Sequence, residues 1–518
     1  MHDEIDSMKQ NGTWELVPKP PKARVINCKW IYKLKDGLKP TDPPRYKSRI
    51  VAKGFSQKEG IDYNDIFAPV VKYKTLRLMI AMPAVFDWHL EQMDVKTAFL
   101  HGDLEEIFLM SQPIGFIDKK HPDYVCFLKK SIYGLKQSPR QWNKKYDACM
   151  ISLHFTRSKY DTCLYFKNVN AKFPLYVLLY VDDILMISGD KSAIAKIKGD
   201  LSVHFDIKDL GHAKKILGVN ILRDKQTKTI YLSQSDYVTK VVDNFGMKNS
   251  KPVSIPLGGH LELSKVDCPK SDQDKLKMSK IPYDVAVGSV MYAMLCTRPD
   301  LAFSISVLSR FMSNPRGKHW LGMKYLLRYL SSTVKLGLVF SDFDSQHDIT
   351  GYVDSDYVSN KDNRKSTTSF FFTWAGNCIS WKSQLQSIVA LSSTEAEYIA
   401  ATEAVKEAIW LKGIVKEVQG RSCVPILHMD SQSALYLCKD HVYHERTKHI
   451  DVRFHFIRDM VESKQIINPA DFGTKIVPSD KFLFCRKSLH ILDIPLECGD
   501  EPMMVGMRPC SVFHKNSP

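Results

Sequence analysis

The amino-acid sequence predicts a multidomain protein of the α+β class. A length of 518 residues is enough for several domains with cores of ordinary size. Hydrophobic residues make up 44% of the chain and charged residues 25%, which is the composition of folded globular proteins. The periodicity of the hydrophobic residues also changes along the chain, from mixed patterns to a helical block and then to short strands. This succession favours several folded units.

The first half of the chain is predicted to contain two strand pairs. Residues 28–37, CKWIYKLKDG, and residues 45–54, RYKSRIVAKG, are predicted to pair. Residues 70–240 mix helical and strand patterns. Within them, two short runs rich in aromatic and β-branched residues, 175–180 and 184–187, are predicted to be strands that meet at a tight turn.

The second half is predicted to begin with a linker and to continue into a strand-rich unit. Residues 250–282 are rich in Pro, Gly, Ser and Lys, which indicates a linker or extended connection. A helical block is predicted from about residue 283 to residue 330. Three short strands follow, in ITGYVDSD, TTSFFFTWAG and NCISWKS, and an amphipathic helix is predicted over residues 391–418.

Net charge and cysteine usage restrict the classes of function. Lys and Arg number 73 against 57 Asp and Glu, a formal net charge of +16, which favours polyanionic partners, with nucleic acid first. The 12 cysteines include no CxxC pair, which argues against a zinc ribbon or disulfide scaffold and favours a reducing compartment. The N-terminal residues lack a signal-peptide core, and no apolar run approaches the ~20 residues of a membrane span. We therefore expect an intracellular protein with no membrane partner.

Two adjacent carboxylates, Asp182 and Asp183, stand between apolar runs in LYVLLYVDDILMISGD. Burying unpaired charge is costly, so the pair needs an explanation. One interpretation is a turn, where Asp is favoured, and the other is a site for a divalent metal, which prefers oxygen ligands. A third carboxylate, Asp94 in HLEQMDVKTAFLHGDLEE, favours the metal, although an Asp at a strand end is commonly a helix N-cap. Together the three supply what a two-metal nucleotidyl-transfer site requires.

A basic segment, KKSIYGLKQSPRQWNKKYD, lies between the two carboxylate motifs. Gly134 could allow close backbone approach to a nucleotide or template. Lys136, Gln137 and Arg140 could contact phosphate or base. The alternative is a basic helix start that faces solvent.

These motifs resemble the reverse transcriptase of copia-type LTR retrotransposon Pol polyproteins. The resemblance rests on RYKSRIVAKGFSQKEGIDYNDIFAPV, QMDVKTAFLHGDLEE, SIYGLKQSPRQW and LLYVDDIL, and it continues through ILGVNI, YAMLCTRPDLAFSISVLSRFMSNP, SSTEAEYIAA, DSQSAL and RTKHIDVRFHFIRD to about residue 490. It implies a right-hand polymerase with fingers, palm and thumb in residues 1–248, then a linker and helical connection in 249–345. A ribonuclease H-like α/β domain in 346–490 and an unassigned tail in 491–518 complete the expected order.

The resemblance also implies roles for residues of the polymerase part. Asp94, Asp182 and Asp183 are expected to bind two Mg²⁺ ions in the palm, for which Mn²⁺ can substitute. Residues of the fingers, the palm and the primer hairpin are expected to bind nucleotide or primer: Lys47, Arg49, Lys53, Gly134, Gln137, Tyr180 and Gly218. The expected partners are an RNA template, a DNA primer, an RNA–DNA hybrid and dNTPs, with the oligomeric state left open.

A second set of carboxylates is expected in the ribonuclease H-like part. Such folds use four acidic residues around two Mg²⁺ ions. The candidates are Asp354, Glu397, Asp430 and Asp471. Asp356 and Glu395 are the alternatives to the first two, since Ser392 and Thr394 both begin capping-box patterns that end in glutamate. A helix-capping role is the alternative for Asp430.

The sequence departs from the family near Asp471. The segment MVESKQIINPAD is about ten residues shorter than in family members, which by the ~3.3 Å rise of a strand residue predicts a displacement of Asp471 by several Å. The four histidines at 441, 444, 449 and 455 fit no common zinc spacing, and a basic surface that touches the hybrid backbone is the favoured interpretation.

The resemblance places such proteins in virus-like particles in the cytoplasm, with the nucleus as an alternative compartment and DNA integration as the later step. The chain carries no zinc-knuckle or integrase His/Cys motif. A second hypothesis is a catalytically degenerate transposon remnant that only binds nucleic acid.

Overall fold

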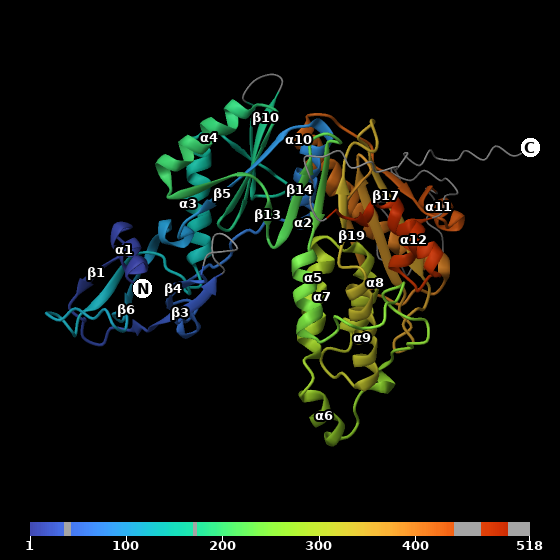
Figure 1. The fold of residues 1–518 in the computed structure, drawn as a ribbon, viewed down its shortest axis with the longest axis horizontal. Coiled ribbons are helices and arrows are strands. Elements are labelled where there is room, and N and C mark those ends of the chain that lie inside the picture. The colour runs from blue at the N-terminus through green and yellow to red at the C-terminus, as the bar shows by residue number, and fades with distance from the viewer. Residues whose placement is uncertain (36–42, 169–172, 440–467, 496–518) are drawn as a thin grey trace, which may run out of the picture.

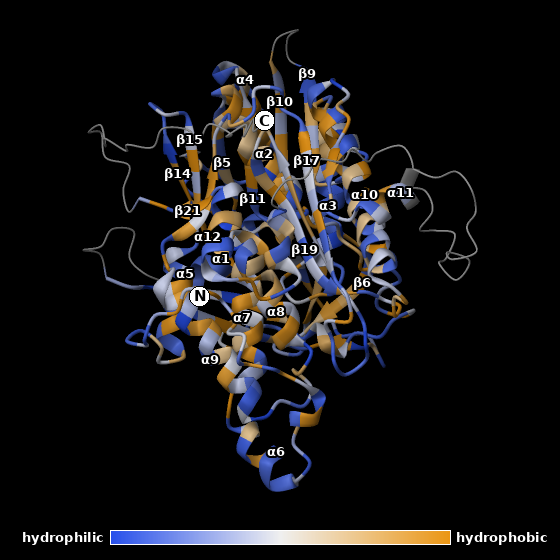
Figure 2. Ribbon diagram, turned by 90° about the vertical axis from the view of Figure 1, so that its right-hand side faces the viewer, coloured by the Kyte–Doolittle hydropathy of each residue, from blue (hydrophilic) through white to orange (hydrophobic). Residues whose placement is uncertain are grey.

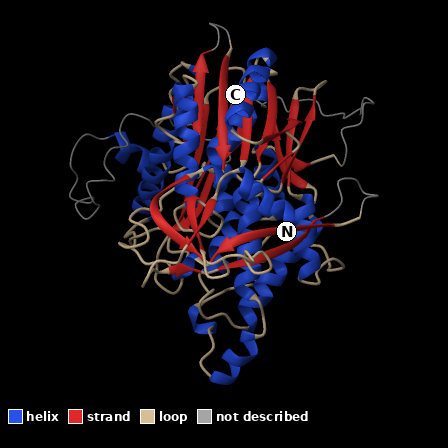
Figure 3. Cartoon of the chain, turned by 90° about the vertical axis from the view of Figure 1, so that its left-hand side faces the viewer, coloured by secondary structure: helices blue, strands red, loops and turns tan. Residues whose placement is uncertain are grey.

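The computed structural model describes residues 1–35, 43–168, 173–439 and 468–495, and within them it shows a mixed α/β chain with five sheets (Figure 1). Helices pack between and around the sheets (Figure 3). The predicted class, α+β and multidomain, is confirmed in this coarse form. No described helix is both long enough and apolar enough to cross a membrane.

The N-terminal part contains two small sheets and one helix, drawn in blue and cyan in Figure 1. The predicted strand pair is confirmed as an antiparallel hairpin of β3 and β4. The elements are α1 (His2–Gln10), the sheet β1 (Trp14–Val17), β7 (Val125–Lys130), β6 (Asp103–Met110) and β2 (Val25–Ile26), and the hairpin β3 (Cys28–Lys35) and β4 (Arg45–Ala52).

A six-stranded sheet follows, and both of its faces are buried. Along β11, Ile184 and Met186 belong to one hydrophobic core and Leu185 and Ile187 to another, as the alternation of a strand requires. Helices α3 (Ser138–Ser152) and α4 (Lys191–His204) cover one face, and α2 (Tyr73–Phe86) the other. In order, the strands are β12 (Ile207–His212), β5 (His89–Val95), β11 (Asp183–Ser188), β10 (Pro174–Tyr180), β9 (Leu164–Asn168) and β8 (Thr156–Arg157).

A five-stranded sheet joins distant parts of the chain. It crosses the expected domain boundaries at residues 248, 345 and 490, because its strands come from both sides of each. Part of the expected tail, Ile491–Asp493, is strand β21 and pairs with β16. In order, the strands are β13 (Lys215–Ile216), β14 (Val219–Asp224), β15 (Thr229–Ser233), β16 (Leu336–Phe340) and β21.

The predicted helical block is confirmed, and the predicted linker is partly helical. Helix α6 forms inside the linker, where Ser271 caps it by accepting a hydrogen bond from the Asp274 N–H. It lies at one end of the molecule and is mainly hydrophilic (Figures 1 and 2). The helices of this region are α5 (Ser235–Asn244), α6 (Asp272–Ser279), α7 (Tyr283–Cys296), α8 (Ala302–Ser309) and α9 (Gly317–Ser332).

The C-terminal unit is a four-stranded sheet with one long helix against it. The predicted three strands and the amphipathic helix are confirmed, and a parallel strand, β20, completes the sheet beside β17. The elements are β19 (Asn377–Leu385), β18 (Thr367–Trp374), β17 (Ile349–Asp356), β20 (Ile426–His428), α10 (Ser393–Gln419), α11 (Gln432–Lys439) and α12 (Ser479–Ser488).

Candidate active sites

The first candidate site is the turn between β10 and β11. Tyr180 pairs with Asp183, so Val181 and Asp182 form the turn itself. Val181 has φ +55°, which is strained for a β-branched residue. Two hydrogen bonds hold this conformation: the Trp142 indole donates to the Val181 carbonyl at 2.5 Å, and the Val95 N–H donates to the Asp182 carbonyl at 2.8 Å.

The register of the neighbouring strand brings the third carboxylate to this turn. Asp183 lies directly opposite Asp94 on β5. The Gln92 amide donates to Asp183 Oδ1 at 2.8 Å. Burial, together with the charges of Asp182 and Asp94, raises the pKa of Asp183 to about 6, although the Gln92 hydrogen bond opposes the shift. Asp94 caps no helix, since the short 3₁₀ turn Ala98–His101 begins after Thr97.

An arginine and a tyrosine stand beside these carboxylates. The Arg49 guanidinium lies 4.7 Å from the centre of the Tyr133 ring. Burial raises the pKa of Tyr133 to about 12, with Arg49 opposing the shift and Asp182 and Asp94 adding to it. Arg49 shares a face of β4 with exposed Lys47, whereas Lys53 follows the strand and donates its N–H to the Asn27 carbonyl at 2.8 Å. The sequence patterns gave no indication of Tyr133, Gln92 or Trp142.

In the structure Gly134 closely approaches another segment of the chain. Its φ is +95°, and a Cβ there would lie 2.2 Å from the Ala52 carbonyl oxygen. The close approach is therefore to the end of β4, whereas the expected approach to a nucleotide or template stays a prediction. The absence of a side chain lets two chain segments touch.

Gln137 is also turned inward, and its expected contact with a nucleotide stays a prediction. It is fully buried, accepts a hydrogen bond from the Gln57 amide at 3.0 Å and donates to the Asp62 carbonyl at 3.2 Å. Nearby, Lys136 donates to the Tyr63 hydroxyl and Arg140 pairs with Asp65. These residues hold the loop after β4 against the start of α3.

Substituting Gly134 by alanine is expected to destabilise the fold by about 3 kcal/mol, since positive φ and overpacking add. Chemical denaturation measures the loss. Gly115 is the matched control, with φ +85° and no atom within 4 Å of the position that a Cβ would take, so Gly115→Ala should cost only about 1 kcal/mol. Equal losses in the two variants would contradict the packing argument.

Gly218 lies in a two-residue turn, as the expected hairpin requires. Leu217 and Gly218 have φ +51° and +69° and connect β13 to β14. The Tyr292 hydroxyl donates to the Leu217 carbonyl. The hairpin thereby rests on helix α7.

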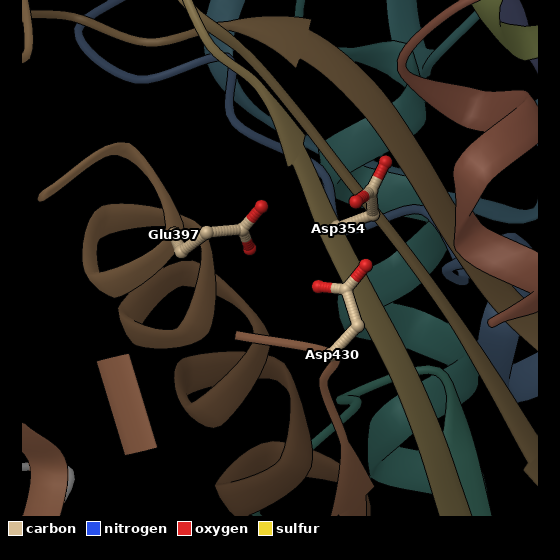
Figure 4. A group of neighbouring side chains, drawn as sticks. All are labelled: Asp354, Glu397 and Asp430. Carbon is tan, nitrogen blue, oxygen red and sulfur yellow. The ribbon is translucent and has the colours of Figure 1, made fainter. Parts of the chain in front are cut away.

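The second candidate site is a group of three carboxylates in the C-terminal unit (Figure 4). Asp354 lies in β17, Glu397 near the start of α10, and Asp430 after β20. Each offers an oxygen, and these oxygens all lie within 4.8 Å of one another. In the described part of the chain no other trio of potential metal ligands is as close, so the oxygens of Asp94, Asp182 and Asp183 are spread more widely.

The electrostatics of this trio is unfavourable without a cation. Burial, then the charges of Asp354 and Asp430, raises the pKa of Glu397 well above its ordinary value. Burial likewise raises the pKa of Asp354 to about 6. Glu397 accepts one hydrogen bond from the Ser355 N–H at 3.1 Å, while its Oε2 is buried with no partner among the described residues.

The two alternatives named from the sequence lie outside the trio. Ser392 is the N-cap of α10 and accepts from the Glu395 N–H, and the Glu395 carboxylate accepts from the Leu391 N–H at 2.7 Å. Glu395 therefore helps to cap the helix. Asp356 is not one of the three grouped carboxylates either.

Asp471 lies near the trio but is engaged elsewhere. It sits in the 3₁₀ turn Pro469–Gly473 and pairs with Lys475 at 3.1 Å and with Lys481. Lys475 Nζ is also 3.7 Å from Asp354 Oδ2. The four histidines and most of the shortened segment fall in residues 440–467, outside the described residues.

A cavity of about 1050 Å³ lies at the opposite end of β5 from Asp94. Its lining includes the charged residues Asp87, Lys214, Arg223, Lys225, Asp236 and Lys335 and the histidines His89 and His212. It belongs to neither carboxylate group.

Comparison with known proteins identifies the class. A family model described as reverse transcriptase (RNA-dependent DNA polymerase) matches residues 11–258. The retrovirus-related Pol polyprotein from transposon TNT 1-94 of Nicotiana tabacum is 50% identical over 94% of this chain and 37% of its own length. That from transposon RE2 of Arabidopsis thaliana is 34% identical over 96% of this chain and 34% of its own. A transposon Ty5-1 protein of Saccharomyces cerevisiae is 34% identical over 61% of this chain and 100% of its own length.

The chain carries a reverse transcriptase domain. More particularly, it belongs to the Pol polyproteins of copia-type transposons, as its motifs indicated. It spans 37% and 34% of the two plant Pol polyproteins, about a third of their length.

Proposed function

We propose that this chain is an RNA-directed DNA polymerase that extends a primer 3′ hydroxyl with dNTPs on an RNA or DNA template. In this proposal residues 1–248 form fingers, palm and thumb, residues 249–345 form the connection, and residues 346–490 form a ribonuclease H-like domain. The observation that carries the proposal is the strand register that sets Asp183 opposite Asp94, with Asp182 in the adjoining turn.

The residues at this turn fit divalent cations such as Mg²⁺ or Mn²⁺. Asp94, Asp182 and Asp183 supply hard oxygen ligands, and burial, followed by the charges of Asp182 and Asp94, raises the pKa of Asp183, a shift that a bound cation would oppose. Two ions bound there would activate the primer hydroxyl and stabilise the leaving pyrophosphate. Arg49 and Lys47 share one face of β4, from which they would bind the triphosphate, and Tyr180, which directly precedes the turn, would contact the primer.

The Mg²⁺ requirement of this reaction should depend on pH. Below about pH 6 Asp183 takes up a proton and no longer offers a full ligand charge, so metal affinity falls. We expect the half-saturating Mg²⁺ concentration for primer extension to be severalfold higher at pH 5.5 than at pH 8. Mg²⁺ titrations of the extension rate measure it, and a constant requirement across this range would contradict the assignment.

We also propose that the Asp354–Glu397–Asp430 group cleaves the RNA strand of an RNA–DNA hybrid. The Glu397 carboxylate supports this, because it points toward Asp354 and Asp430 (Figure 4), and its buried Oε2 has no partner among the described residues, which fits a bound cation. The test is cleavage of a labelled hybrid in Mg²⁺ by the full chain and by Asp430→Asn. Cleavage lost in the variant supports the proposal, and no cleavage by the parent at any enzyme concentration overturns it.

The test of the polymerase is RNA-templated primer extension by the purified chain in Mg²⁺, with a chelator control. Extension that requires Mg²⁺ supports the proposal. If the chain binds hybrid at low salt but does not extend the primer, it is instead a remnant that only binds nucleic acid, which its net charge of +16 also favours.

A further inference from the structure

The second carboxylate group carries a cation of its own. Lys475 Nζ lies 3.1 Å from Asp471 Oδ1 and 3.7 Å from Asp354 Oδ2, so one ammonium group bridges the two carboxylates. Lys481 also pairs with Asp471, on its other oxygen. Both oxygens of Asp471 are therefore taken by lysines.

This arrangement divides the group into two unlike halves. On one side, Asp354, Glu397 and Asp430 crowd their oxygens within 4.8 Å, and the buried Glu397 Oε2 has no partner among the described residues. Among the described residues, no lysine or arginine forms an ion pair with Glu397 or Asp430. On the other side, the space between Asp354 and Asp471 already holds the Lys475 ammonium.

A pair of catalytic ions would occupy the same two positions, one among Asp354, Glu397 and Asp430 and the other between Asp354 and Asp471. Two-metal sites hold their ions roughly 3.5–4 Å apart, bridged by shared oxygens. Here Asp354 is the carboxylate that both halves share, and a second ion beside it would meet the positive charge of Lys475. The residues present therefore fit one divalent ion and do not fit two while Lys475 stays in place.

We propose that this group binds one divalent cation tightly, at Asp354, Glu397 and Asp430, and that the Lys475 ammonium takes the position of the second. The assignment of the group to hybrid cleavage rests on the proposed function, whereas the number of ions does not. A second ion binds only when Lys475 moves away. That movement is open to it, because the side chain is flexible and 40% exposed.

Counting bound Mn²⁺ by electron paramagnetic resonance tests the proposal on the full chain. Asp182→Asn and Asp183→Asn are introduced together to remove the other metal site. In this background we expect one tightly bound Mn²⁺ per chain. Lys475→Met, which keeps the length of the side chain and removes its charge, should strengthen binding of a second ion by about tenfold or more and give the spectrum of two coupled ions. Lys475→Gln serves as the second variant.

Lys481→Met is the matched control. It removes the same charge from the same carboxylate but leaves the Lys475 bridge to Asp354, so it should keep the parental count of one. Melting temperatures in chelator verify that the variants fold.

The outcomes separate this inference from the proposed activity. Two ions of similar affinity in the parent, or an unchanged second site in both Lys475 variants, would overturn the inference. Absence of any bound Mn²⁺ would overturn it together with the metal site itself. One bound ion without hybrid cleavage would overturn the proposed nuclease and leave the inference standing.

Discussion

Replacing Asp183 by asparagine is expected to reduce RNA-templated primer extension by about a thousandfold or more, because metal ligation supplies several kcal/mol of charge stabilisation to the transition state. Asp183 lies between Asp94 on the next strand and Asp182 in the turn, so it is the carboxylate best placed to be shared by two metal ions. Asparagine keeps the size of the side chain and an oxygen that accepts the Gln92 hydrogen bond. The rate of single-turnover extension at saturating dNTP measures the loss.

The neighbouring Asp190 provides a matched control for this substitution. It follows the same strand, β11, but caps helix α4 by accepting from the Ser192 and Ala193 N–H groups. Asparagine caps helices as well as aspartate does, so Asp190→Asn should extend primers within about twofold of the parent. Parental extension by Asp183→Asn would contradict the assignment of Asp183. Failure of the parent and of Asp183→Asn alike, with hybrid binding intact, would favour the remnant hypothesis.

Local features of both sites could be predicted from the sequence. The hairpin at Asp182 and Asp183 follows from two short β-rich runs around a turn. The long helix that carries Glu397 follows from its hydrophobic period and its capping serine. These features are encoded within about ten residues of chain, where local propensity and pattern act.

Contacts between distant segments could not be predicted in the same way. Nothing near Gly134 indicates that its missing side chain makes room for Ala52, more than 80 residues away in the sequence. The bridge from Lys475 to Asp354 is likewise formed by tertiary packing alone. For both positions the residue type was compatible with a surface role, and only the tertiary packing reveals the contact.

A buried arginine makes contacts between the proposed domains that likewise could not be predicted from the sequence. Arg77 of α2 donates to the Ile379 carbonyl of β19 at 2.7 Å and to the Leu295 carbonyl of α7 at 2.7 Å, and it stacks 3.8 Å from the Trp381 ring centre. It thereby ties together the parts proposed as palm, connection and ribonuclease H-like domain. In the sequence it looks like an ordinary helix-surface residue.

The second large effect is expected at Glu397. Replacing it by glutamine should abolish hybrid cleavage and, in chelator at pH 8, raise the melting temperature by about 3 °C. The cause of the stabilisation is electrostatic: burial and the charges of Asp354 and Asp430 raise the pKa of Glu397, so its ionised form is disfavoured in the folded chain. Glutamine fills the same space without that charge.

The pH dependence has a definite sign. A carboxyl group whose folded pKa is raised contributes stability below its unfolded pKa, and this contribution is lost as pH rises through the folded pKa. Because the pKa of Asp354 is raised to about 6, its contribution to stability is lost between about pH 4 and pH 6. The raised pKa of Glu397 extends the loss of stability to higher pH. In chelator, the parent should therefore melt at lower temperature as pH rises, and Glu397→Gln should show a flatter profile.

Two further measurements, one with added Mg²⁺ and one with a variant of the neighbouring Glu395, test whether the expected stabilisation is specific to Glu397. Added Mg²⁺ should raise the melting temperature of the parent at pH 8 and have a smaller effect on Glu397→Gln, since one ligand charge is gone. Glu395→Gln is the control within the same turn of α10: its carboxylate accepts the Leu391 N–H at 2.7 Å, so weakening it should lower the melting temperature. If both substitutions raised the melting temperature, the loss of any charge at the start of α10 would stabilise the chain. The stabilisation by Glu397→Gln would then no longer support the argument that Glu397 is a metal ligand held against the repulsion of Asp354 and Asp430.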